Sequence, residues 1–168
     1  MDIKVPFYSI INILMPGLVL TGSIIFLFLD EVADLILRIA SLENIGLEIL
    51  LTVVALAIAY EVGYIIFRLG ASVIEPILKK VFGWVSYDKF VAAKKSGATS
   101  LDMLSREYSY ARTHIVLFIA MSILTGLREH WIIMGLCIAC VILFVITARN
   151  HINKIITTVE IYLSQIND

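Results

Sequence analysis

Four long blocks of apolar residues, separated by polar stretches, dominate the pattern of the chain. They are the runs 7–29, 45–67, 108–127 and 131–148. A helix rises 1.5 Å per residue, so about 20 residues cross a hydrocarbon core of about 30 Å. Each block is close to that length or above it. The pattern therefore predicts an all-α integral membrane protein, built as a four-helix bundle.

The segment 68–112 is the most polar part of the chain and predicts amphipathic helices on the cytoplasmic side. Its apolar residues recur at the spacing of one helix face. They are Ile74, Ile77, Leu78, Val81, Phe82 and Val85. Two interpretations fit: a helix lying on the membrane surface, or a stripe that packs on the ends of the bundle. Thr99 and Asp102 resemble a capping box, which predicts that a helix begins there and continues into the third span.

The C-terminal segment 149–168 predicts a further cytoplasmic helix. Its apolar residues follow the a/d spacing of a short coiled coil. They are Ile152, Ile156, Val159, Leu163 and Ile166. Three interpretations stay open: the seam extends an oligomer, docks a partner, or folds back on its own chain.

The distribution of charge predicts that both ends of the chain lie in the cytoplasm. Lysine and arginine in loops favour that side of a membrane. With this orientation, eleven of the thirteen lysines and arginines are inside, and only Arg38 and Arg128 are outside. The net charge of −1 gives no reason to expect direct nucleic-acid binding.

Polar residues inside the predicted spans are candidates for a functional cluster. Glu61 is the first of them, because an ionisable group within a span is costly and frequently functional. The expected cluster comprises Asn12, Glu61, Tyr64, Arg68, Arg112 and His114. It is interpreted as a clamp between helices, as a proton- or ion-responsive gate, or, for Glu61, as a carboxylate that reaches the lipid headgroups.

Two further residue sets predict contacts. A ridge of small residues on the second span allows close helix packing, within the bundle or between subunits. The ridge is Thr52, Ala55, Ala59 and Gly63. Lysines of the middle segment are expected to face anionic lipid. These are Lys79, Lys80, Lys94 and Lys95.

The sequence contains no motif that predicts catalysis, a cofactor or a metal. Cys137 and Cys140 form a CxxC in the middle of the fourth block, where a thiolate is disfavoured. Two cysteines without further ligands do not make a zinc site. We therefore expect a protein that is not an enzyme and binds no cofactor.

Three stretches give the chain a resemblance to a known family. They are Tyr60–Tyr64 leading to Arg68, Tyr87–Phe90, and the run Arg106–Arg112 that enters the third span. With the four-span layout, they resemble the membrane subunit of the Kiwa-type bacterial phage-defence system, usually called KwaA. The resemblance implies a non-enzymatic homo-oligomer in the bacterial inner membrane that senses phage and works with a cytoplasmic, DNA-engaging partner.

Two functions follow as expectations. The first is an oligomeric inner-membrane sensor or scaffold whose cytoplasmic helices recruit or regulate a soluble partner. The second is a gated channel or membrane-perturbing effector, motivated by Glu61 and by the Pro16-Gly17 kink predicted in the first span. Few polar residues line the spans, so a constantly open pore is not expected.

Overall fold

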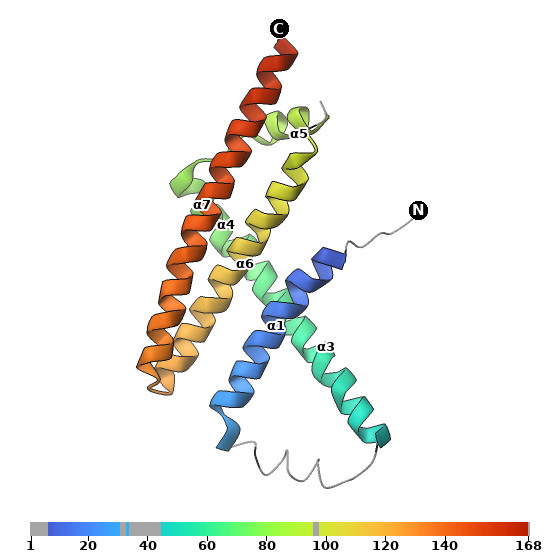
Figure 1. Cartoon of the computed structure of the whole chain (residues 1–168), viewed down its shortest axis with the longest axis vertical. Coiled ribbons are helices and arrows are strands. Elements are labelled where there is room, and N and C mark those ends of the chain that lie inside the picture. Colours follow the sequence, from blue (N-terminus) through green and yellow to red (C-terminus); the bar gives the residue numbers. More distant parts are fainter. Residues whose placement is uncertain (1–6, 31–32, 34–44, 96–97, 168) are drawn as a thin grey trace. The chain divides into compact units, whose positions relative to one another are not determined.

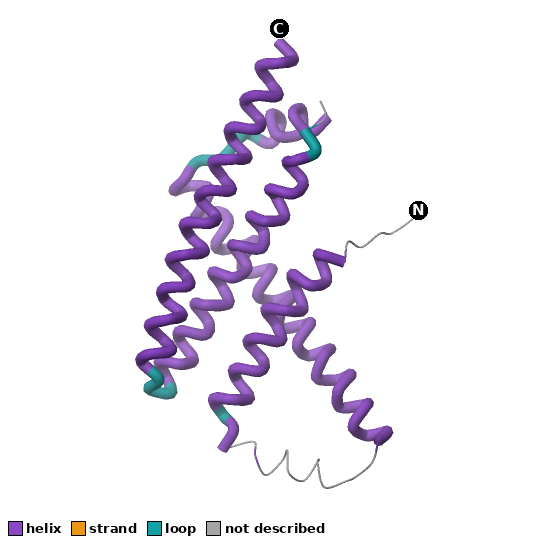
Figure 2. Tube along the Cα trace, viewed as in Figure 1, coloured by secondary structure: helices purple, strands orange, loops and turns teal. Residues whose placement is uncertain are grey.

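The computed structural model describes residues 7–30, 33, 45–95 and 98–167, which are helical along most of their length (Figures 1 and 2). The elements are α1 (Phe7–Leu27), α3 (Ile45–Leu69), the π-helical turn η1 (Gly70–Ile74), α4 (Glu75–Phe82), α5 (Tyr87–Lys95), α6 (Ser100–Leu127) and α7 (Trp131–Asn167). No strand occurs in this part of the chain, and the predicted all-α class is confirmed.

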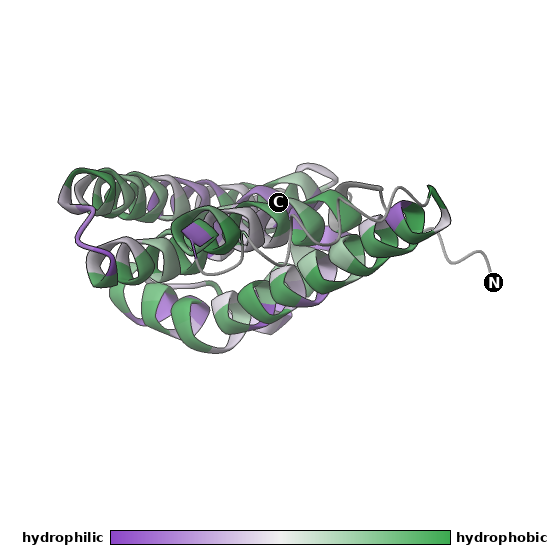
Figure 3. Ribbon diagram, turned by 90° about the horizontal axis from the view of Figure 1, so that it is seen from below, coloured by the Kyte–Doolittle hydropathy of each residue, from purple (hydrophilic) through white to green (hydrophobic). Residues whose placement is uncertain are grey.

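Four of the described helices are long and apolar enough to cross a membrane. They are Ile10–Leu27, Ile45–Phe82, Ser100–Leu127 and Trp131–Ser164. Much of the helical ribbon in Figure 3 has the green colour of hydrophobic residues. A helix that is apolar on most sides suits lipid as its solvent. The chain thus has the construction of a multi-pass membrane protein.

The helix boundaries differ from the predicted ones at α7 and agree with them at the start of α6. The α7 helix continues without a break over 37 residues, so the fourth span and the predicted C-terminal helix are one element. The α6 helix begins at Ser100, directly after the predicted cap at Thr99. The carboxylate of Asp102 accepts a hydrogen bond from Lys94 Nζ at 2.6 Å, so this acidic side chain binds a lysine of α5.

The chain forms two compact units, and each is described by itself. Unit 1 contains Met1–Arg68 and Leu117–Ile138, and unit 2 contains Leu69–Val116 and Ala139–Asp168. Both α6 and α7 contribute residues to each unit.

In unit 1, α1 and α3 cross where both helices lack side-chain bulk (Figure 1). A Cβ atom on Gly17 would overlap the carbonyl oxygen of Ala59, and one on Gly63 would overlap that of Ile13. Small residues allow such close approach of helix backbones in lipid. The predicted ridge is thus confirmed at Ala59 and Gly63, whereas the remaining two members, Thr52 and Ala55, are exposed.

Unit 2 has a hydrophobic core of its own, to which α4, α5, α6 and α7 contribute. Its buried members include Leu78, Ala93, Leu101, Tyr108, Ile115, Ile152 and Val159. Part of the predicted apolar stripe of the middle segment is packed inside the protein, and part of it is exposed. Leu78 is buried in this core, whereas Ile77 and Val81 are 53% and 66% exposed.

The C-terminal seam mostly folds back on its own chain. Ile152 and Val159 are fully buried in the core of unit 2, and Ile156 and Leu163 pack against it partly buried. The side chain of Ile166 lies outside the described residues. Ile152 and Val159 share this core with residues of α4, α5 and α6, as the fold-back interpretation expects, and a contact of the seam with a partner or a second copy stays a prediction.

Candidate functional site

The residues of the predicted polar cluster divide between the two units: Asn12, Glu61, Tyr64 and Arg68 belong to unit 1, and Arg112 and His114 belong to unit 2. In unit 1, Asn12 is buried at 7% exposure. Arg68 Nε donates a hydrogen bond of 2.8 Å to the hydroxyl of Tyr64, one turn earlier on α3, and the guanidinium lies 5.0 Å from the ring centroid. Glu61 is exposed and makes no hydrogen bond or ion pair within the described residues. A clamp between helices through Glu61 is thus not formed in this unit.

The other two members of the predicted cluster find their partners inside unit 2. Arg112 forms an ion pair with Glu75, so the acid that it meets is not Glu61. His114 Nδ1 lies 2.9 Å from the carbonyl oxygen of Tyr110, and its ring stacks on Phe144 with centroids 5.0 Å apart. The prediction missed Glu75, although the i, i+4 spacing of Glu75 and Lys79 was a signal for it.

Because the Glu61 side chain has no partner among the residues that the structure describes, its substitution is expected to leave the fold unaffected. We expect Glu61→Gln to change the free energy of unfolding by less than about 0.5 kcal/mol, as is usual for surface positions. The measurement is unfolding of the purified protein in detergent. A loss above about 1 kcal/mol would restore the clamp interpretation.

A compact charge cluster forms at the start of α4. Glu75 pairs with Lys79 at 2.6 Å and also with Arg112, so one carboxylate serves two cations. The side chains are 20%, 32% and 12% exposed, in the order Glu75, Lys79 and Arg112. The Lys79 ammonium also lies 4.3 Å from the centroid of the Trp84 ring. Partial burial makes these interactions stronger than at an open surface.

The backbone explains how α4 and α6 come close at this cluster. The π turn η1 comes directly before Glu75. A Cβ on Gly70, its first residue, would lie 3.3 Å from the carbonyl oxygen of Arg112. Glycine therefore allows α6 to approach the π turn, and such turns are frequent at functional sites.

Two of the four lysines expected at the lipid surface are engaged within the chain. Lys79 pairs with Glu75, and Lys94 pairs with Asp102 at 2.6 Å. Each ammonium therefore has a carboxylate partner of its own chain, and the contact of these lysines with anionic lipid stays a prediction. Lys80 and Lys95 are exposed and remain available for anionic lipid.

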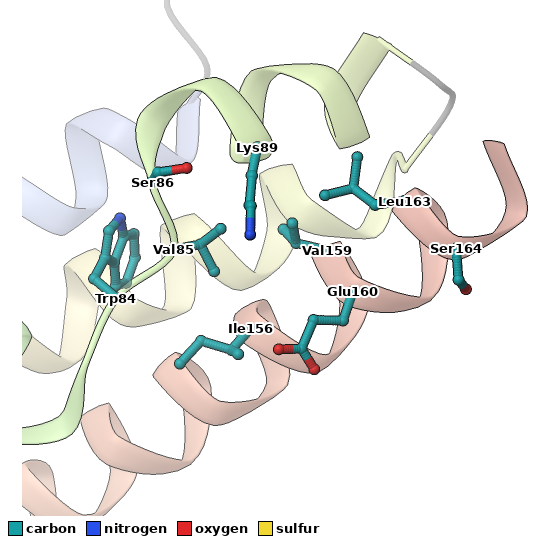
Figure 4. Close-up of a pocket in the computed structure, with 9 residues that line it drawn as sticks. All are labelled: Trp84, Val85, Ser86, Lys89, Ile156, Val159, Glu160, Leu163 and Ser164. Atoms are coloured by element: carbon teal, nitrogen blue, oxygen red, sulfur yellow. The ribbon is translucent and has the colours of Figure 1, made fainter. Parts of the chain in front are cut away.

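An open groove of about 480 Å³ lies in unit 2 between the start of α5 and the C-terminal part of α7 (Figure 4). Ile156, Val159 and Leu163 of the seam contribute apolar side chains to it. Lys89 and Glu160 add one charge of each sign, and both are exposed. The seam residues that are only partly buried, Ile156 and Leu163, thus line this groove.

No group of three or more metal-ligating side chains occurs among the described residues. Cys137 is buried, and both cysteines are free thiols. A comparison of the chain with protein-family models, with curated proteins and with solved structures finds no match. The function is therefore inferred from the residues of this chain.

Proposed function

We propose that this protein is an oligomeric sensor or scaffold of the bacterial inner membrane, serving a defence system, and that unit 2 recruits or regulates a cytoplasmic partner. We also propose that both ends of the chain lie in the cytoplasm. The resemblance to the Kiwa membrane subunit is likewise proposed. The resemblance alone supplies the defence role.

The observation that supports it most is the length of α7. About 20 residues suffice to cross the membrane, so roughly 17 of its 37 residues extend beyond the span, a length of about 25 Å. This extension packs with α4, α5 and the first part of α6 into a separate core. A helix that is continuous from the span into such a core suits a protein that passes a signal from the membrane to the cytoplasm.

The groove beside α7 is where we place the partner. Reversing both of its charges, in Lys89→Glu/Glu160→Lys, keeps the net charge of the protein and is expected to weaken partner recruitment about tenfold. Both side chains are exposed, so the fold is expected to persist. The measurement is native mass spectrometry of the protein purified from its own host in mild detergent, with copurifying proteins identified. Lys95→Glu, an exposed lysine that does not line the groove, is the matched control.

The outcomes separate the hypotheses. A homo-oligomer that carries a stoichiometric soluble partner, lost in the double variant and kept in Lys95→Glu, supports the sensor or scaffold. If the double variant recruits the partner as well as Lys95→Glu does, the partner does not bind in the groove. An oligomer that never carries a partner would favour the gated channel or effector.

One observation favours that second function. Glu61 is exposed on α3 without a partner in the described part of the chain, and a carboxylate within a span can line an ion path between copies. A channel of this kind would lose ion flux in Glu61→Gln while keeping its fold. Unchanged membrane potential after induced expression and triggering would count against it.

A further inference from the structure

A second pocket, which shares only Trp84 with the groove that we assign to the partner, opens in unit 2 with a volume of about 450 Å³. Residues of α4, α5, the intervening segment 83–86 and the first half of α6 line it. Small-molecule sites have volumes of about 300–1,000 Å³, so the pocket has the size for a small ligand and not for a macromolecule.

The charges that line this pocket are mostly positive. Lys79 and Arg112 share the single carboxylate of Glu75. The other carboxylate of the lining, Asp102, already pairs with Lys94. A third cation, Arg106, is exposed and makes no hydrogen bond or ion pair with any residue that the structure describes. A ligand in this pocket therefore meets an excess of positive charge.

A buried hydroxyl in the same lining lacks a partner. Tyr108 is 3% exposed, and its hydroxyl has no hydrogen-bond partner among the described residues. The tyrosine ring lies near two other side chains of the lining: the Trp84 ring is 5.4 Å away between centroids, and the Arg112 guanidinium is 5.9 Å from the ring centroid. Buried polar groups are normally hydrogen-bonded, so this hydroxyl calls for an acceptor that the folded chain does not supply.

Further aromatic side chains line the pocket, together with Ser105 and Ser109. Trp84 and Phe90 are half-buried against the core of unit 2, whereas Tyr87 is 78% exposed. Such rings pack against the apolar part of a ligand at low entropic cost. The lining thus offers two kinds of surface, one cationic and one aromatic.

We propose that this pocket binds a phosphate-bearing small molecule. The guanidinium fork of arginine matches a phosphate group with paired hydrogen bonds, and it carries a permanent charge. Arg106 and Arg112 supply this fork, and a phosphate oxygen gives the Tyr108 hydroxyl its acceptor. The aromatic rings hold the apolar part of the ligand. The phosphate comes from an anionic phospholipid of the adjoining membrane surface or from a soluble nucleotide, and the experiment distinguishes the two.

The test uses the full chain, purified in detergent and stripped of lipid. Binding of phosphatidylglycerol is counted by native mass spectrometry, with diacylglycerol of the same acyl chains as the probe without phosphate. Binding of ATP and of inorganic phosphate is measured by calorimetry. The variants are Arg106→Gln, which removes the positive charge and shortens the side chain, and Tyr108→Phe, which removes only the hydroxyl. Each is expected to weaken binding about tenfold, as loss of a hydrogen bond to a charged group does.

The control is Lys95→Gln, which removes an exposed cation outside the pocket. Phosphatidylglycerol binding that both pocket variants weaken, and the control does not, supports a lipid ligand. The same pattern with ATP or phosphate supports a soluble one. The proposal is overturned if neither class binds, if diacylglycerol binds equally well, or if Lys95→Gln weakens binding as much. It is also overturned if Tyr108→Phe binds as tightly as the wild type.

Thermal unfolding of each variant checks that the fold is kept. No partner protein is present in these measurements. Failure of the pocket proposal is therefore distinguishable from failure of the recruitment test, which uses groove residues and protein from the host.

Discussion

Replacing Gly63 with alanine is expected to lower the free energy of unfolding by about 2 kcal/mol, through the crossing of α1 and α3. The added Cβ would overlap the backbone carbonyl of Ile13, and a backbone atom cannot move aside as a flexible side chain can. Overpacking costs about 1–3 kcal/mol or more, whereas alanine gains at most about 1 kcal/mol in helix propensity over glycine. The steric effect therefore wins. The measurement is reversible unfolding in detergent.

Gly22 provides the control, because it lies on α1, one of the two crossing helices, and its added Cβ would meet no neighbouring atom within 4 Å. Gly22→Ala is expected to be neutral or slightly stabilising, so the two substitutions differ in sign. Gly17→Ala is expected to act as Gly63→Ala does, since its Cβ would overlap the Ala59 carbonyl. Equal effects of Gly22→Ala and Gly63→Ala would contradict the close crossing.

Replacing Glu75 with glutamine is expected to destabilise unit 2 by about 3 kcal/mol. The substitution leaves Lys79 and Arg112 facing each other without the carboxylate that both contact. Removing one partner of a buried ion pair costs about 3–5 kcal/mol, and the 20% exposure of Glu75 places the expected value at the lower end. Chemical unfolding of the purified variant measures the loss.

The Lys94–Asp102 pair is the exposed counterpart, with side chains 52% and 53% exposed. Exposed pairs contribute about 0–1 kcal/mol, so Lys94→Gln is expected to have a small effect. A double-mutant cycle with Glu75→Gln and Arg112→Gln is expected to show a coupling of about 1–3 kcal/mol. A coupling near zero would show that the two side chains do not form the ion pair in the protein.

Most of the architecture was predictable from the sequence, because a span needs about 20 apolar residues and lipid leaves few alternatives to a helix. The four blocks match the helices of the structure, and the start of α6 was marked by Thr99 and Asp102. The ridge was predicted from its spacing, although only Ala59 and Gly63 lie at the crossing. Spacing alone could not reveal that Gly17 faces them from α1.

The charge pairing was not predictable in the same way. Helical spacing relates residues within one or two turns, and it predicted that Tyr64 and Arg68 share a face. Arg112 and Glu75 lie on different helices, which approach each other at a π turn that the sequence did not indicate. Of the residues expected around Glu61, only Arg112 belongs to the charge cluster at Glu75.

By itself, the sequence determined the all-α class, the four apolar helices and the amphipathic character of the middle segment and the seam, because these follow from local periodicity and length. Only the tertiary structure decided which faces are covered. It buried Ile152 and Val159 within the chain, left Glu61 exposed, and joined Glu75 to two cations. Burial depends on which helices pack together. Contacts between residues far apart in the chain decide which helices do so.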